Sequence, residues 1–197
     1  MDIYLIERDP WKFKCLELYF KNLDNVHTVN ADFRDFIKET QVECVVSPAN
    51  SFGLMDGGYD RALTEWYGEQ LQERVQQYII TYFYGEQPVG TSFIIDTNKD
   101  GQKLIHTPTM RVPQTITDPC VVYQCMRTTL ITATENNVKS ILIPMFGGRT
   151  GGVKPDVIAK MMRFGLDQLQ SVPAKLDWEY TNRIAAELAN AAISYTE

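Results

Sequence analysis

The residues best placed to do chemistry lie in a loop between an apolar run, residues 42–46, and a segment of helical periodicity that begins at Tyr59. Asn50 and Ser51 supply short polar side chains there. The loop also carries three glycines, Gly53, Gly57 and Gly58. A glycine loop that leads into a helix presents unpaired backbone N–H groups, which bind anions. The loop predicts a phosphate cradle with Asn50 at its edge, and a plain tight turn is the alternative.

A second glycine-rich loop, residues 146–153, follows another apolar run, residues 140–145, and leads into a helix that starts at Pro155. It holds Gly147, Gly148, Gly151 and Gly152. Such a density of glycine indicates close approach of the backbone to a ligand. Two such loops at the ends of buried strands predict one crevice in an α/β sheet. Neither the Walker loop nor the dinucleotide-binding glycine pattern is present.

Alternating strands and helices must position these loops. The patterns predict strands at 2–7, 26–30, 42–46, 90–97, 102–107 and 140–145, with a hairpin turn at 98–101. They predict helices at 10–21 and 33–40, from 59 to about 84 with a break at Gly68, from Asp118 as N-cap, and from Pro155. This order is typical of one α/β domain spanning residues 1–197. An additional helix at about 177–195 would pack on the domain edge or form a contact in a homo-oligomer.

Composition narrows the classes of function. The 197 residues carry a net charge of -6, which argues against a broad nucleic-acid surface. No apolar run approaches the length of a membrane helix, and the N-terminus is not a signal peptide, so the cytoplasm is expected. Four cysteines without a C-x-x-C pair and two histidines predict free thiols and no metal site. No cofactor is expected.

Three motifs, taken in order, resemble those of macrodomains, the ADP-ribose-binding (Appr-1-p processing) family. The most specific motif runs from Pro48-Ala49-Asn50-Ser51 to Gly57-Gly58-Tyr59-Asp60. Its residue sequence is most similar to that of the phage-tail-type macrodomain-like proteins. Asp32-Phe33 and the loop at 146–153 are the other two. The resemblance implies a three-layer α/β/α sandwich with a mixed central sheet. It also implies that the ligand is ADP-ribose or an ADP-ribosylated molecule.

The resemblance also implies roles for individual residues. Asp32 and Phe33 would hold adenine, although Asp32 could simply cap the short helix that follows it. Asn50 would bind the distal ribose. The first loop would contribute Ala49, Asn50, Ser51, Gly57, Gly58 and Tyr59. The second loop would contribute Gly147, Gly148, Arg149, Thr150, Gly151, Gly152 and Val153.

A further question is whether the protein also hydrolyses ADP-ribosyl linkages. In hydrolytic macrodomains the residues equivalent to Asn50 and Asp60 orient or deprotonate a water, and the resemblance implies the same here. Asp60 also fits a structural role in the first turn of a helix. The sequence departs from the catalytic pattern at three places, namely Thr64, Arg149 and Met55-Asp56. The alternatives are a phage-derived assembly protein that keeps the fold without catalysis, and a nucleotide or S-adenosylmethionine enzyme that uses Glu7.

Overall fold

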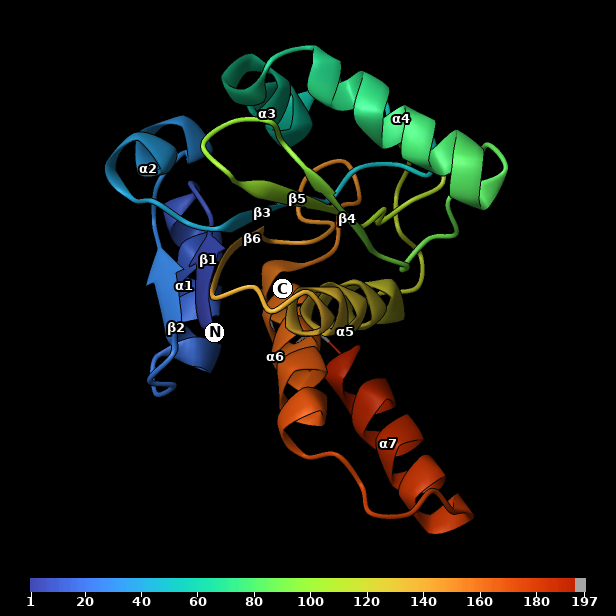
Figure 1. Cartoon of the computed structure of the whole chain (residues 1–197). Coiled ribbons are helices and arrows are strands. Elements are labelled where there is room, and N and C mark those ends of the chain that lie inside the picture. The colour runs from blue at the N-terminus through green and yellow to red at the C-terminus, as the bar shows by residue number, and fades with distance from the viewer. Residues whose placement is uncertain (194–197) are drawn as a thin grey trace.

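A six-stranded mixed sheet forms the centre of the protein, as the computed structural model shows for residues 1–193 (Figure 1). The strands are β1 (Asp2–Ile6), β2 (Val26–Val29), β3 (Cys44–Ser47), β4 (Phe93–Asp96), β5 (Lys103–His106) and β6 (Ser140–Pro144). Their order is β2-β1-β6-β3-β5-β4, and every neighbouring pair is parallel except β4 with β5. The carboxyl ends of β1, β6 and β3 therefore meet at one edge of the sheet.

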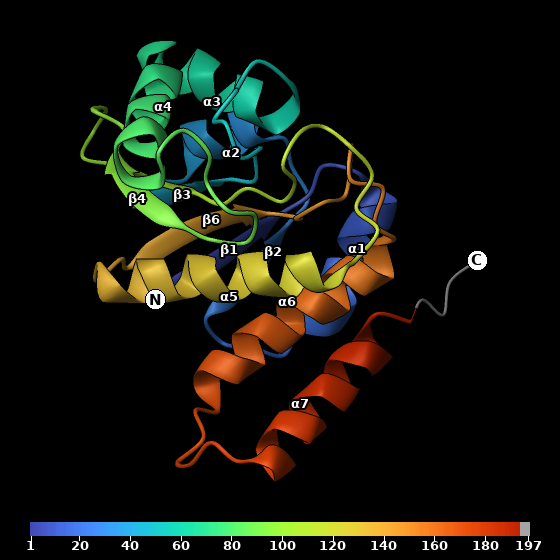
Figure 2. The same ribbon diagram turned by 90° about the vertical axis from the view of Figure 1, so that its right-hand side faces the viewer.

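Helices cover both faces of this sheet (Figure 2). They are α1 (Pro10–Phe20), α2 (Phe33–Glu39), α3 (Gly58–Tyr67), α4 (Gln70–Phe83), α5 (Cys120–Glu135), α6 (Pro155–Gln170) and α7 (Trp178–Ala191). Helices α1, α5 and α6 pack on one face, and α2, α3 and α4 pack on the other. The predicted α/β/α sandwich with a mixed central sheet is confirmed.

Period-two alternation along the strands builds the two cores. In β1, Leu5 faces the core under α1, α5 and α6, whereas Ile6 faces the core under α2, α3 and α4. Neighbouring side chains of a strand point to opposite faces, so a strand buried on both sides must be apolar throughout. Strand β6 shows this in Leu142 and Ile143, which are fully buried in opposite cores.

Most predicted elements are present with shifts of one to three residues at their ends. The turn at 98–101 joins β4 to β5, and Gly68 separates α3 from α4 as predicted. The helix predicted with Asp118 as its N-cap begins one residue later than expected, with Pro119 at the N-cap position and Cys120 as its first residue, whose N–H donates to the Asp118 carboxylate at 2.9 Å. Within residues 1–193, no helix is both long and apolar enough to cross a membrane.

The tail helix α7 lies along the edge of the domain, beside α6 (Figures 1 and 2). It buries none of its side chains fully. It ends at Ala191, before the predicted end at residue 195, which lies outside the described residues. A contact with a second copy of the chain stays a prediction.

Candidate functional site

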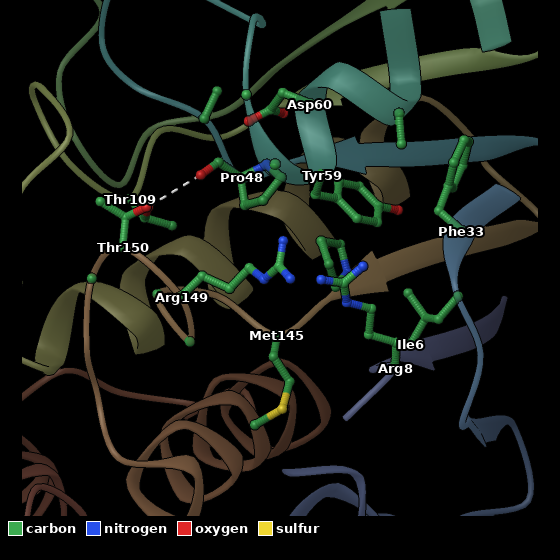
Figure 3. A pocket seen from close by; sticks show the side chains of 18 of the residues that line it. Ile6, Arg8, Phe33, Pro48, Tyr59, Asp60, Thr109, Met145, Arg149 and Thr150 are labelled. Atoms are coloured by element: carbon green, nitrogen blue, oxygen red, sulfur yellow. Dashed lines mark hydrogen bonds between the residues drawn. The ribbon is translucent and has the colours of Figure 1, made fainter. Parts of the chain in front are cut away.

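A pocket of about 380 Å³ opens where β1, β6 and β3 end (Figure 3). Its walls come from segments far apart in sequence: residues 6–8, 31–34, 48–62, 109–113 and 144–151. Parallel strands deliver their following loops to the same edge of a sheet, which is why these segments meet. Both predicted glycine loops line this one pocket, as a single crevice requires.

One wall of the pocket is the N-terminus of α3, which has no side-chain cap. Gly57 occupies the N-cap position, and Gly58 follows with a φ of 58°. Within the described chain, the backbone N–H groups of Gly58, Tyr59 and Asp60 have no hydrogen-bond acceptor. Asp56 does not cap this helix either, although it lies nearby and is exposed. The arrangement leaves three donors and the positive end of a helix facing the pocket.

The Asn50 amide is tied mainly to its own loop. Its Nδ2 donates to the Leu54 carbonyl at 2.8 Å, and its Oδ1 accepts from the N–H groups of Phe52 (3.1 Å) and Leu54 (3.3 Å). An amide nitrogen carries two hydrogens, so one N–H of Asn50 is still available to a ligand. Asn50 thus fixes the shape of the first loop and keeps a single donor at the pocket.

Asp60 is half-buried in the first turn of α3 and lines the pocket. Its Oδ1 accepts a 2.6 Å hydrogen bond from the hydroxyl of Ser47 at the end of β3. Burial raises the pKa of Asp60 to about 7, and the negative charge of Asp56 adds to the rise, while the Ser47 bond opposes it. A carboxyl group that titrates near neutral pH is suited to general base catalysis.

Asp32 is both the N-cap of α2 and a pocket residue, so the two readings of its sequence position are compatible. Its Oδ1 accepts from the Arg34 N–H at 3.0 Å, and its Oδ2 lies 3.4 Å from an Arg8 nitrogen. Burial alone would raise the pKa of Asp32, but the Arg34 N–H and the two guanidinium groups outweigh it and lower the pKa.

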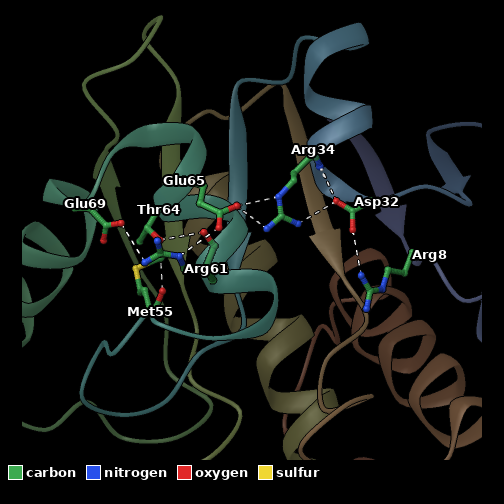
Figure 4. A network of polar contacts seen from close by, with 8 residues as sticks. All are labelled: Arg8, Asp32, Arg34, Met55, Arg61, Thr64, Glu65 and Glu69. Carbon is green, nitrogen blue, oxygen red and sulfur yellow. Dashed lines mark hydrogen bonds and ion pairs between the residues drawn. The ribbon is translucent and has the colours of Figure 1, made fainter.

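The Asp32 carboxylate belongs to a chain of ion pairs that ties α2 to α3 (Figure 4). Arg34 contacts Asp32 at 3.4 Å and Glu65 at 2.6 Å. Arg61 then bridges Glu65, at 3.3 Å, and Glu69, at 3.1 Å. These pairs are largely exposed and individually weak, but together they restrict where the Asp32 side chain can lie.

Phe33 and Tyr59 form an aromatic wall at the same end of the pocket. Their rings meet edge to face, with centroids 5.4 Å apart. The Tyr59 hydroxyl is buried without a hydrogen-bond partner among the described residues, and burial raises its pKa well above the usual value. The phenol therefore stays neutral, and the wall is apolar enough to receive a planar ring.

The second glycine loop forms the opposite wall. Gly147 has a φ of 74°, and a Cβ at Gly151 would come within 2.7 Å of the Gly147 carbonyl oxygen, so both positions need glycine. Arg149 extends from this loop into the pocket, and its guanidinium lies 4.0 Å from the position of a Cβ on Gly58 (Figure 3). Arg149 forms no ion pair within residues 1–193. The pocket thus holds a cation that is free to meet an anion.

The structure brings most of the predicted site residues together. Those that line the pocket are Asp32, Phe33, Ala49, Asn50, Gly57, Gly58, Tyr59, Asp60, Gly147, Gly148, Arg149, Thr150 and Gly151. Three others are not in its lining. Ser51 is buried and its N–H donates to the Met110 carbonyl, Gly152 donates to Arg149, and Val153 donates to Gly147. These three residues shape the loops.

Three other polar residues make local or structural hydrogen bonds. His106 is buried outside the pocket lining, with Nδ1 2.6 Å from the Gln87 amide oxygen, and burial lowers its pKa to about 3. Asp9 caps α1 by accepting from the N–H of Trp11, and Glu7 accepts from the N–H of Asp9. Glu7 does reach the pocket lining, but its hydrogen bond is local.

Several pocket residues were not identified from the sequence. Arg8 is the most informative, because it follows β1 and points into the pocket towards Arg149 (Figure 3). The pairing of Ile6 with Pro144 in β1 and β6 sets the two arginine-bearing loops side by side. Met145, Thr109 and Pro113 are also among the lining residues. A charged residue close to the end of a buried strand was the available signal for Arg8.

Comparison with known proteins places this geometry in a family. The model of the family described as Macro domain matches residues 46–162, more than half of the chain. An uncharacterized protein of Aquifex aeolicus is 33% identical over 128 residues, which are 64% of this chain and 73% of that protein. An uncharacterized protein of Aeropyrum pernix is 26% identical over 125 residues, which are 63% of each chain.

Solved structures show the same fold. A mutant macrodomain of Oceanobacillus iheyensis with ADPR has a TM-score of 0.60 at 19% identity, covering 79% of this chain and 87% of that one. The same macrodomain with ADP has a TM-score of 0.59 at 21% identity, covering 81% and 87%. The macrodomain of Mycobacterium tuberculosis DarG has a TM-score of 0.57 at 20% identity, covering 66% and 85%. The chain belongs to the Macro domain family.

Proposed function

We propose that this protein binds ADP-ribose, free or as an ADP-ribosyl group on another molecule. The observation that carries the proposal is the unpaired N-terminus of α3, which faces the free guanidinium of Arg149 across one pocket. Backbone N–H groups at a helix N-terminus and an arginine are the donors that bind a diphosphate. The macrodomain of Oceanobacillus iheyensis, with ADPR and with ADP, gives the proposal independent support.

The remaining walls suit the two ends of such a ligand. Asp32 supplies a carboxylate acceptor for an exocyclic amine beside the aromatic wall of Phe33 and Tyr59, which fits adenine. Asn50 and Asp60 lie at the first loop and the start of α3, where they would meet the distal ribose. The diphosphate would then lie between α3 and the second glycine loop.

Hydrolysis of an ADP-ribosyl linkage is the finer part of the proposal. Asp60 would accept a proton from a water, whose oxygen attacks C1 of the distal ribose while the bond to the leaving group breaks. Its pKa of about 7 supports this role, because a general base works best when it titrates near the working pH. Asn50 would hold the loop and orient the water. Membership of the phage-tail-type subgroup stays a prediction, and a phage-derived assembly role without catalysis stays the alternative.

Two assays test the two levels of the proposal. ADP-ribose should raise the melting temperature of the protein more than AMP does, and S-adenosylmethionine should leave it unchanged. Release of ADP-ribose from a mono-ADP-ribosylated protein should fall about a hundredfold or more in Asp60→Asn, the usual range for loss of a general base. Asp118→Asn, outside the pocket, is the matched control. If ADP-ribose raises the melting temperature but the protein releases no ADP-ribose from the modified substrate, the binding proposal stands and the hydrolysis proposal is wrong.

A further inference from the structure

A lysine of α1, which packs on the face of the sheet opposite α3, contacts the second glycine loop. Lys12 lies in the first turn of α1, and its Nζ donates a 2.6 Å hydrogen bond to the carbonyl oxygen of Gly148. The contact is partly buried and joins residues 136 positions apart in the chain. Lys12 itself is not part of the pocket lining. A charge-assisted hydrogen bond of this kind is about twice as strong as a neutral one.

The direction of this hydrogen bond decides where the next N–H points. In a trans peptide unit the C=O of one residue and the N–H of the following residue point in opposite directions. Lys12 draws the Gly148 carbonyl towards α1, so the N–H of Arg149 must point away from α1. The pocket lies on that side, because its opposite wall is α3 on the other face of the sheet.

The neighbouring carbonyls of the loop are held in the same manner by the loop's own backbone. The Gly147 carbonyl accepts from the Val153 N–H at 3.2 Å, and the Arg149 carbonyl accepts from the Gly152 N–H at 3.0 Å. Three consecutive carbonyls are thus occupied. Across the described part of the chain, the N–H groups of Gly148, Arg149 and Thr150 find no acceptor. Of the three restraints on these carbonyls, Lys12 alone is a side chain and alone is charged.

The rear of the loop is also closely packed, which makes this orientation specific. A Cβ built on Gly148 would lie 3.3 Å from a methyl carbon of Ile158 and 3.8 Å from the Cβ of Met145. The side chains of Ile158 in α6 and of Met145, which follows β6, therefore lie against the rear of Gly148. The ammonium group behind the peptide also polarises it, which strengthens the Arg149 N–H as a donor to an anion.

We propose that Lys12 is a positioning residue, which acts from the α1 side of the loop to aim the backbone N–H group of Arg149 at the diphosphate of the ligand. The inference rests on the proposed function, because it assumes an anion between the two glycine loops. It assigns Lys12 no contact with the ligand. Its signature is a loss of affinity confined to ligands that carry the diphosphate, since adenosine would meet only the wall of Asp32, Phe33 and Tyr59.

The test compares Lys12→Met with Lys14→Met, an exposed lysine of the same helix. We expect Lys12→Met to weaken ADP-ribose binding about tenfold or more, as for loss of a hydrogen bond to a charged group. Adenosine affinity, followed by NMR titration, should stay within about twofold, since no hydrogen bond on that wall changes. Lys12→Arg should restore most of the ADP-ribose affinity, because it returns a cationic donor, and Lys14→Met should bind as the wild type does.

The outcomes separate the inference from the proposed function. If the wild-type protein binds ADP-ribose and Lys12→Met binds it equally well, the positioning role is wrong and the proposed function stands. Equal losses for ADP-ribose and adenosine in Lys12→Met would show general damage to the domain, which also overturns the positioning role. If the wild-type protein binds no ADP-ribose, the proposed function fails and the inference fails with it.

Discussion

The Ser47 hydroxyl donates a 2.6 Å hydrogen bond to the Asp60 carboxylate, joining the last residue of β3 to the first turn of α3. The bond holds one carboxylate oxygen in place beside the pocket. It also opposes the rise in the Asp60 pKa that burial and the Asp56 charge produce. The outcome is a carboxyl group with a fixed position and a pKa of about 7.

This relationship predicts that Asp60 lowers stability as the pH rises. The folded-state pKa of about 7 lies above the ordinary value of 3.8, so the folded protein binds more protons between these values. Protonation of Asp60 therefore contributes to the free energy of unfolding in full below about pH 4, and this contribution is lost as the pH rises to about 7. Asp60→Asn should therefore unfold at a higher urea concentration than the wild type at pH 8, with the difference shrinking towards pH 4. A constant difference at all pH values would contradict the raised pKa.

The fold and the two loops could be predicted from sequence because their signals are local. Strand–loop–helix boundaries are visible in apolar runs, in Pro48 and Pro155, and in glycines such as Gly58 and Gly147. These are the positions where the backbone itself needs a special residue type, at a strand end or a positive φ. The hairpin at 98–101 was predictable for the same reason.

The residues that were missed depend on contacts between distant segments. Arg8 reaches the pocket only because β1 pairs with β6, and no spacing in the sequence shows that pairing. The capture of the Gly148 carbonyl by Lys12 depends on how α1 packs beside the loop. The hydrogen bond from the Asn50 amide to the Leu54 carbonyl could not be predicted from the sequence either, because the amide could face either its own loop or a ligand.

Asp32 can be tested without removing its helix cap. In Asp32→Asn the side-chain oxygen should still accept the hydrogen bond from the Arg34 N–H. The amide nitrogen then takes the place of the second carboxylate oxygen, the one that would face adenine. A donor then meets the donor of the adenine amine, and we expect adenosine affinity to fall about tenfold or more by NMR titration. Asp177→Asn makes the same change at the cap of α7, far from the pocket, and should bind adenosine normally. Unchanged adenosine affinity in Asp32→Asn would remove Asp32 from the adenine wall.

Alanine substitutions at Gly58 and at Gly101 distinguish the effect of backbone strain from the effect of blocking the pocket. Their φ values are 58° and 70°, and an added Cβ would meet only Arg149 at 4.0 Å from Gly58 and nothing within 4 Å of Gly101. Alanine at either position should cost about 1–2 kcal/mol of stability, because L residues disfavour this region. Only Gly58→Ala should weaken ADP-ribose binding, because its methyl group enters the pocket. Equal affinities of the two variants would place the ligand elsewhere.

Arg149 should contribute a salt-sensitive share of the affinity. Its exposed guanidinium interacts with the diphosphate through charge, which added salt screens. Arg149→Gln should bind ADP-ribose more weakly at about 0.05 M salt and approach the wild type at about 0.5 M, where the screening length is short. Arg8→Gln should show the same trend if Arg8 turns from Asp32 to the ligand, and Arg183→Gln on α7 should show none. Parallel salt curves for Arg149→Gln and the wild type would exclude a direct charge contact.

Titration calorimetry of the wild-type protein with ADP-ribose tests the central claim most directly, with AMP and S-adenosylmethionine as controls. The geometry predicts one site with a dissociation constant in the micromolar range, about 8 kcal/mol of binding free energy. AMP should bind more weakly, and S-adenosylmethionine should release no heat. Absence of heat with ADP-ribose would contradict the claim that the pocket between α3 and the second glycine loop is an ADP-ribose site.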